Sequence, residues 1–199
     1  MEISNRFTMK KITILLVCVL FQVSSYSQDS IPPYLVGKIK YPAFNFHPYM
    51  GVIDTDNTVL KYNPEIDYKI AIDVYDKIKD STKLASTIRE VGRTYNLNVA
   101  NGVPTEKLKI AVVLHGWSIF AVLNDKAYEE KFGVKNPNLE VIKAYKNQGI
   151  EFYICGQNLG FFNIPQENLA PEIDVAISAK TALVTLDQLG YSYLNVNED

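Results

Sequence analysis

Apolar, strand-like segments alternate with helix-like segments over residues 67–196, and this alternation constrains the fold more than any other feature. The segments YKIAIDVYD at 68–76, KLKIAVVLHG at 107–116 and IEFYICG at 150–156 are rich in apolar residues, the second almost without interruption. Strands of this kind, apolar on both faces, are typical of a parallel sheet that helices cover on both sides. With IDVAIS at 173–178 and YSYLNV at 191–196, the strands number five. We therefore predict a three-layer α/β/α domain with a mainly parallel five-stranded sheet.

The segments between these strands show helical spacing of apolar residues or helix boundaries. Ser81 is a candidate N-cap for the first expected helix, and a glycine ends or directly follows each of the others. The expected helices cover residues 81–102, 117–132, 136–149 and 179–190.

Residues 1–27 are predicted to be a signal peptide. Two lysines precede an apolar run, residues 12–21, which is too short to span a bilayer, and a polar segment with small residues follows it. We place cleavage near Ser27 and expect an exported, periplasmic protein without stable membrane insertion. Cys18 lies inside the apolar run, so cleavage leaves Cys155 as a lone cysteine that has no intramolecular disulfide partner.

Residues 28–66 are rich in proline and tyrosine. Five prolines exclude long helices from this segment, because proline removes a backbone donor and clashes with the preceding turn. We expect an N-terminal arm, with room for short edge strands, that wraps the domain formed by residues 67–199.

Composition excludes several function classes. The chain carries 20 basic and 22 acidic residues and no basic run, so we expect no nucleic-acid binding. No strand is followed by a glycine pattern that binds nucleotides, and Ser118 has no GxSxG around it. With only His47 and His115 as histidines, a zinc site is not expected. We expect no cofactor and no metal.

Two residues with possible chemistry end neighbouring strands of the predicted sheet. His115 ends the segment VVLHG and Cys155 ends FYICG, each directly before a glycine. Ligands of wound α/β sheets gather at the carboxyl ends of the strands. We therefore take Cys155 and His115 as candidate catalytic residues. The candidate ligand-binding residues beside them are Gly116, Trp117, Gly156, Gln157 and Asn158.

Cys155 has two interpretations. As a thiolate, stabilised by the amides of the turn that follows, it could attack an electrophilic sulfur, and His115 could donate or accept a proton. As a thiol enclosed by apolar neighbours, it would pack in the core as a small, unreactive apolar side chain, which is common for free cysteine. The residues alone leave both open.

Several motifs together resemble the DsrE/DsrF-like family of small sulfur-relay proteins. They are YKIAIDVYD, LKIAVVLHGWSIFAVL, NPNLEVIKAYKNQGIEFYICGQNL and IDVAISAKTALVTLDQLGYSYL, in this order over residues 67–195. Exported members of the family are the most similar. The resemblance implies an α/β/α domain that forms homo-oligomers, with a cysteine at the position of Cys155 that accepts sulfur as a persulfide and passes it on.

The signal peptide and the resemblance together thus lead us to expect an exported protein that binds or relays sulfur through Cys155, with a donor or acceptor protein or a small sulfur species as its partner. Sulfur-transfer activity would make it an enzyme, which the residues alone do not establish. The alternative is a non-catalytic module of the same fold that binds a small ligand or assembles into oligomers.

Overall fold

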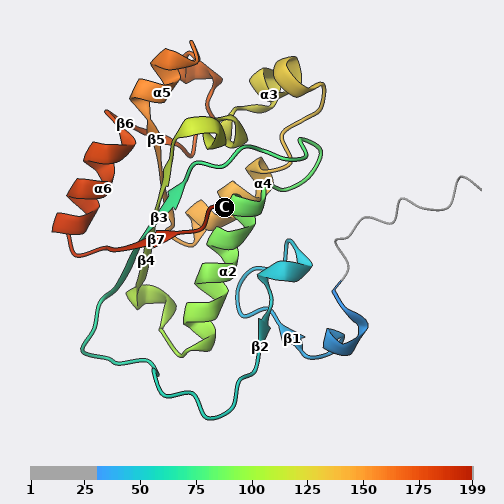
Figure 1. Ribbon diagram of the computed structural model, residues 1–199, viewed down its shortest axis with the longest axis vertical. Coiled ribbons are helices and arrows are strands. Elements are labelled where there is room, and N and C mark those ends of the chain that lie inside the picture. The colour runs from blue at the N-terminus through green and yellow to red at the C-terminus, as the bar shows by residue number, and fades with distance from the viewer. Residues whose placement is uncertain (1–30, 199) are drawn as a thin grey trace, which may run out of the picture. The chain divides into compact units, whose positions relative to one another are not determined.

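The computed structural model describes residues 31–198, which contain a five-stranded, entirely parallel sheet (Figure 1). The strands lie in the order β6-β5-β4-β3-β7. The two strands of this sheet that come first along the chain, β3 and β4, are therefore neighbours in its interior. The predicted five-stranded α/β fold is confirmed. The strands are β3 (Tyr68–Val74), β4 (Leu108–Leu114), β5 (Glu151–Cys155), β6 (Asp174–Ala176) and β7 (Ser192–Asn195).

The central strand β4 is buried on both faces, which explains its nearly continuous apolar sequence. Ile110, Val112 and Leu114 belong to the larger core on one face of the sheet. Ala111 and Val113 belong to a smaller core on the other face. The edge strands β6 and β7 are mostly exposed.

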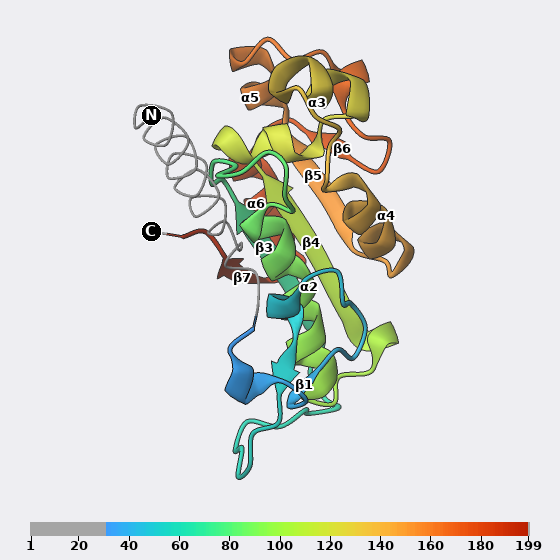
Figure 2. The same ribbon diagram turned by 90° about the vertical axis from the view of Figure 1, so that its right-hand side faces the viewer.

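Helices cover the two faces unequally (Figures 1 and 2). One face carries α2 (Ser86–Ala100) and α4 (Leu139–Asn147), whose apolar side chains fill the larger core. The other face carries α6 (Ala179–Gln188) alone, which contacts all five strands of this sheet. The small side chains of Ala71 and Ala111 beneath α6 leave room for close approach of this helix.

Two further helices, α3 (Asp125–Phe132) and α5 (Gly156–Phe161), lie at the end of the sheet where the strands finish, uppermost in Figure 1. The first of these differs from the prediction of one helix over 117–132. The chain instead forms a 3-10 helix, Gly116–Val122, followed by an extended Leu123 and a new helix start at Asn124.

Two asparagines explain this break. The side chain of Asn124 accepts a hydrogen bond from Ala127 N and caps α3. The buried Asn136 donates to the carbonyls of Ala121 and Leu123, which a continuous helix would have used internally.

The first predicted helix also starts later than expected. α2 begins at Ser86, and Ser81 is not its N-cap. The N-cap position is Ala85, whose backbone N–H donates to the buried side chain of Asn138. This long-range bond holds the residue at which the helix starts, and no side chain of the described residues caps the first turn.

The segment before β3 forms its own small antiparallel pair, β1 (Ile39–Lys40) with β2 (Val52–Ile53), separate from the main sheet. It is joined to α2 through the buried Asn96, which accepts from Ala43 N and Phe44 N and donates to the carbonyls of Phe44 and Met50. Short 3-10 helices complete the structure at Pro33–Leu35, Pro48–Met50, Thr105–Lys107 and Gln166–Asn168.

The predicted signal peptide lies outside the described residues. Within residues 31–198, no helix has the length and apolar character needed to cross a membrane.

Candidate functional site

Three adjacent strands bring Asp73, His115 and Cys155 to the same face and the same end of the sheet. Leu114 of β4 pairs with Ile154 of β5, and His115 and Cys155 are the residues that follow this pair. His115 continues the extended backbone of β4, so its side chain falls on the α6 side with Ala111 and Val113. Neighbouring strands lie about 4.8 Å apart, so the backbone positions that carry these two side chains are adjacent across the sheet.

His115 is held by a carboxylate from the strand on its other side. Its Nε2 lies 2.9 Å from Oδ1 of Asp73, which is only 6% exposed, whereas the His115 side chain is 31% exposed. An ionised carboxylate accepts, so Nε2 carries the proton and Nδ1 of a neutral imidazole is left as an acceptor. No residue of the described chain hydrogen-bonds to Nδ1. This is the geometry of a base oriented by a third group.

The Asp73 carboxylate has a second donor, Tyr193 of the edge strand β7. Tyr193 Oη donates to Asp73 Oδ2 at 2.8 Å, and this hydrogen bond, together with burial, raises the pKa of Tyr193 to about 12. The ring of Tyr75 lies 5.3 Å from that of His115. The network therefore joins three strands through one carboxylate.

Asp73 and Tyr193 were not among the site residues predicted from the sequence. A signal for Asp73 was present, because an acidic residue between Ile72 and Val74 in a buried strand must find a partner. Tyr193 gave no such signal, since only the tertiary structure brings the last strand beside β3.

Cys155 is buried, with 5% of its surface exposed. It ends β5 beneath α6, in the smaller core with Val113, Ala179 and Leu186. Within residues 31–198 its sulfur has no hydrogen-bond partner. Cys155 thus follows the same pair of strand residues as His115, but its thiol is covered by apolar side chains.

The glycines after His115 and Cys155 have distinct steric roles. Gly116 has φ +56°, a left-handed conformation that favours glycine. At Gly156, a Cβ would lie 2.9 Å from the carbonyl oxygen of Ala176 in the neighbouring strand. Asn158 links the two strand ends, because its Oδ1 accepts from Gly116 N at 3.0 Å.

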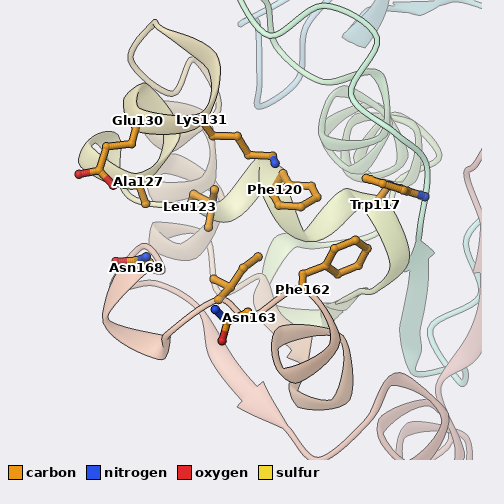
Figure 3. Close-up of a pocket in the computed structure, with 10 residues that line it drawn as sticks. Trp117, Phe120, Leu123, Ala127, Glu130, Lys131, Phe162, Asn163 and Asn168 are labelled. Carbon is orange, nitrogen blue, oxygen red and sulfur yellow. The ribbon is translucent and has the colours of Figure 1, made fainter.

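Two of the predicted ligand-binding residues point elsewhere. Gln157 is exposed and donates to the carbonyl of Ile177. Trp117 is half exposed and packs against Phe120 and Phe162, which belong to the core on the opposite face from Cys155. These three rings line a hollow of about 490 Å³ at this end of the molecule (Figure 3).

The described part of the chain contains no group of three histidine, cysteine or acidic side chains that could hold a metal ion. The site therefore consists of an oriented imidazole, a carboxylate with two donors, and a covered thiol. The imidazole and carboxylate can transfer a proton, and the thiol can react once a reagent gains access to its sulfur.

A comparison with protein-family models matches residues 69–196 to the DsrE/DsrF-like family, which is more than half of the chain. The chain belongs to the DsrE/DsrF-like family. The matched region begins inside β3 and ends just after β7, so it covers every strand that contributes to the site. The arm before β3 lies outside the match.

The fold of this DsrE/DsrF-like chain is similar to that of a solved protein of unknown function, MTH1491, from Methanobacterium thermoautotrophicum. The two share 17% identity with a TM-score of 0.51, over 65% of this chain and 99% of the other. At this identity the likeness concerns the fold alone. No curated protein matches the sequence.

Proposed function

We propose that this DsrE/DsrF-like protein binds or relays sulfur as a persulfide on Cys155. The observation that carries the proposal is that His115, one strand away from the cysteine, hydrogen-bonds to the buried Asp73 of the next strand. A base fixed in this way, next to a thiol, is the arrangement that activates sulfur nucleophiles. Family membership adds support.

In the proposed step, His115 accepts the thiol proton and Cys155 attacks the terminal sulfur of a polysulfide. The new S–S bond forms on Cys155 as the adjacent S–S bond of the donor breaks, and the shortened polysulfide leaves with the electron pair. Asp73 stabilises the imidazolium that results, and Tyr193 holds the carboxylate in place. A small sulfur species or a carrier protein would be the donor, and a second thiol the acceptor.

The burial of Cys155 favours a second candidate function. A thiol that is 5% exposed reacts slowly with bulky reagents, and an inert cysteine would fit a non-catalytic module that binds a small ligand or a neighbouring subunit. The two candidates differ in the rate of alkylation. The relay predicts that Cys155 is alkylated by iodoacetamide and that the rate of alkylation falls when His115 is replaced by Gln.

Intact-mass spectrometry after polysulfide treatment tests the relay. With Cys18→Ser to leave a single thiol, the chain should gain about 32 Da, the mass of one sulfur atom, and lose it on reduction. Cys155→Ala should gain nothing, and Asp73→Asn should slow the gain by about tenfold, less than the full contribution of a general base, because His115 remains but loses the carboxylate that orients it. A folded chain that never gains this mass would contradict the relay and leave the non-catalytic module as the remaining candidate.

We also propose that the chain forms a homo-oligomer through the α6 side of the sheet. Exposed apolar side chains gather there, among them Ile177, Val184 and Leu189, beside a hollow of about 340 Å³ between α6 and β5. Exposed apolar patches of this kind typically mark interaction surfaces.

The oligomer is tested by light scattering coupled to size-exclusion chromatography. Val184→Asp should shift the wild-type oligomer toward monomer, because a carboxylate would be desolvated in the contact. Val59→Asp, which makes the same change at an exposed position in the arm, should leave the mass unchanged. A wild-type chain that is monomeric at every concentration would contradict the proposal.

Export is proposed on the sequence pattern of residues 1–27. Expression in a bacterial host should yield a periplasmic form whose N-terminus, determined by sequencing, lies near Gln28. An uncleaved chain retained in the cytoplasm would refute it.

A further inference from the structure

A smaller hollow, outside the Cys155 site, shares Trp117, Phe120 and Lys131 with the hollow of Figure 3. It measures about 230 Å³. We call it the lysine-rimmed hollow, and its lining residues are Lys77, Ile78, Trp117, Phe120, Lys131 and Phe132. They come from three segments: the loop after β3, the 3-10 helix after β4, and the end of α3. Neither Cys155 nor His115 lines it.

The walls of this hollow are aromatic and partly uncovered. Phe120 packs edge-to-face on Phe132, with ring centroids 6.3 Å apart, and Trp117 lies 6.0 Å from Phe120. Half of the surface of Trp117 is exposed. An apolar body placed here would remove this aromatic surface from water, which is favourable.

Two lysines lie over the aromatic walls. Lys131 Nζ is 4.1 Å from the ring centroid of Phe120, and Lys77 Nζ is 5.7 Å from that of Trp117. Within residues 31–198 neither ammonium forms a salt bridge. The close-up shows Lys131 extending over Phe120 (Figure 3).

Acidic residues adjoin both lysines in sequence, but neither lysine forms a salt bridge with them in the described part of the chain. Glu130 points away from Lys131 in Figure 3, and Asp76 accepts a hydrogen bond from Glu198 N. Two cations that form no salt bridge, at the rim of an aromatic hollow, are complementary to a ligand that has an apolar body and one anionic group.

We propose that the lysine-rimmed hollow binds a small aryl carboxylate. Its ring would stack among Trp117, Phe120 and Phe132, and its carboxylate would accept hydrogen bonds from Lys77 and Lys131. The size fits, because a cavity of about 150 Å³ holds a benzene ring, which leaves space for a short acid chain. This site acts independently of the sulfur chemistry at Cys155.

The single tryptophan of the chain is Trp117, so its fluorescence responds to a ligand in this hollow. Trp117 also lines the hollow of Figure 3, whereas Lys77 lines only the lysine-rimmed one of the two, so a variant at Lys77 tells them apart. Titration of the full chain with phenylacetate should change the emission along a saturating curve, and calorimetry run in parallel should give the same Kd. Phenylacetamide has nearly the same shape without the charge, and we expect it to bind at least about tenfold more weakly, as for loss of a charge-assisted contact.

Variants locate the carboxylate. Lys77→Gln and Lys131→Gln should each raise the Kd about fivefold or more, whereas Lys126→Gln, an exposed lysine on the same helix α3 but outside the hollow, should not. Cys155→Ala should bind phenylacetate as the wild type does, which separates this test from that of the persulfide.

Three results would overturn the proposal. The first is no heat of binding and only a linear fluorescence change up to the order of 10 mM ligand. The second is equal affinity for the acid and the amide. The third is a loss of affinity in Lys126→Gln that matches the loss in Lys131→Gln, which would indicate a general charge effect.

Discussion

Asp73 illustrates how one side chain connects otherwise separate strands. It sits in β3 at 6% exposure, and its two oxygens are used by His115 of β4 and Tyr193 of β7. A buried carboxylate without donors would be costly, so these bonds are what allow an acidic residue at this position. His115 is predicted from the sequence but the carboxylate that orients it is not, because hydrogen-bond partners on different strands follow no fixed spacing along the chain.

The replacement Asp73→Asn should lower the pKa of Tyr193 from about 12 toward its ordinary value of about 10. The reason is that the charged acceptor and the negative charge that disfavours the phenolate would both be removed. NMR titration of tyrosines labelled at Cζ measures this, with Tyr193→Phe to assign the resonance. Asp187→Asn, in the exposed part of α6, is the matched control; an unchanged Tyr193 pKa in Asp73→Asn would contradict the network.

At the scale of elements, strand identities follow from local sequence, whereas helix boundaries and the position of the arm do not. The division of residues 116–132 into a 3-10 helix and α3 depends on Asn136, which lies beyond both. The arm depends on Asn96 in the same way. Its four hydrogen bonds fix residues that have almost no regular structure of their own.

Replacing Asn96 by Ala should therefore destabilise the chain by about 3 kcal/mol, because several buried backbone groups of the arm lose their partners. Urea unfolding gives the free energy, and hydrogen exchange should show faster exchange at Phe44. Asn98→Ala is a suitable control, since the Asn98 side chain donates to Thr94 O within α2 and its loss should cost less than about 1 kcal/mol. Equal losses in the two variants would show that the arm is held by other contacts.

At the scale of the whole molecule, buried tyrosines join the layers on the α2 side of the sheet. Tyr128 of α3 donates to Ser81 O, and Tyr145 of α4 donates to Ile88 O in α2. Burial raises the pKa of Tyr128 to about 12 and raises that of Tyr145 further. Phenols that tie the structure together thus remain protonated in the folded chain at pH values where they would ionise in the unfolded chain.

This shift predicts a loss of stability in alkali. Below about pH 10 both states hold the phenol protons, so the stabilisation is complete; above it the unfolded chain releases them first, and stability falls toward about pH 12. The free energy of unfolding in urea should be lower at about pH 11 than at about pH 8. The fall should be smaller in Tyr128→Phe, and a constant free energy over this range would refute the account.

The sequence by itself determined the order of strands and helices, the burial of β4 on both faces, and the placement of Cys155 and His115 at neighbouring strand ends. These properties depend on periodicity and on apolar runs, which are local. Only the tertiary structure decided that Asp73 and Tyr193 orient His115, that Trp117 faces away from Cys155, and that α6 covers the thiol. Each of these depends on contacts between segments far apart in the chain, where packing and hydrogen-bond satisfaction, not local spacing, select the partners.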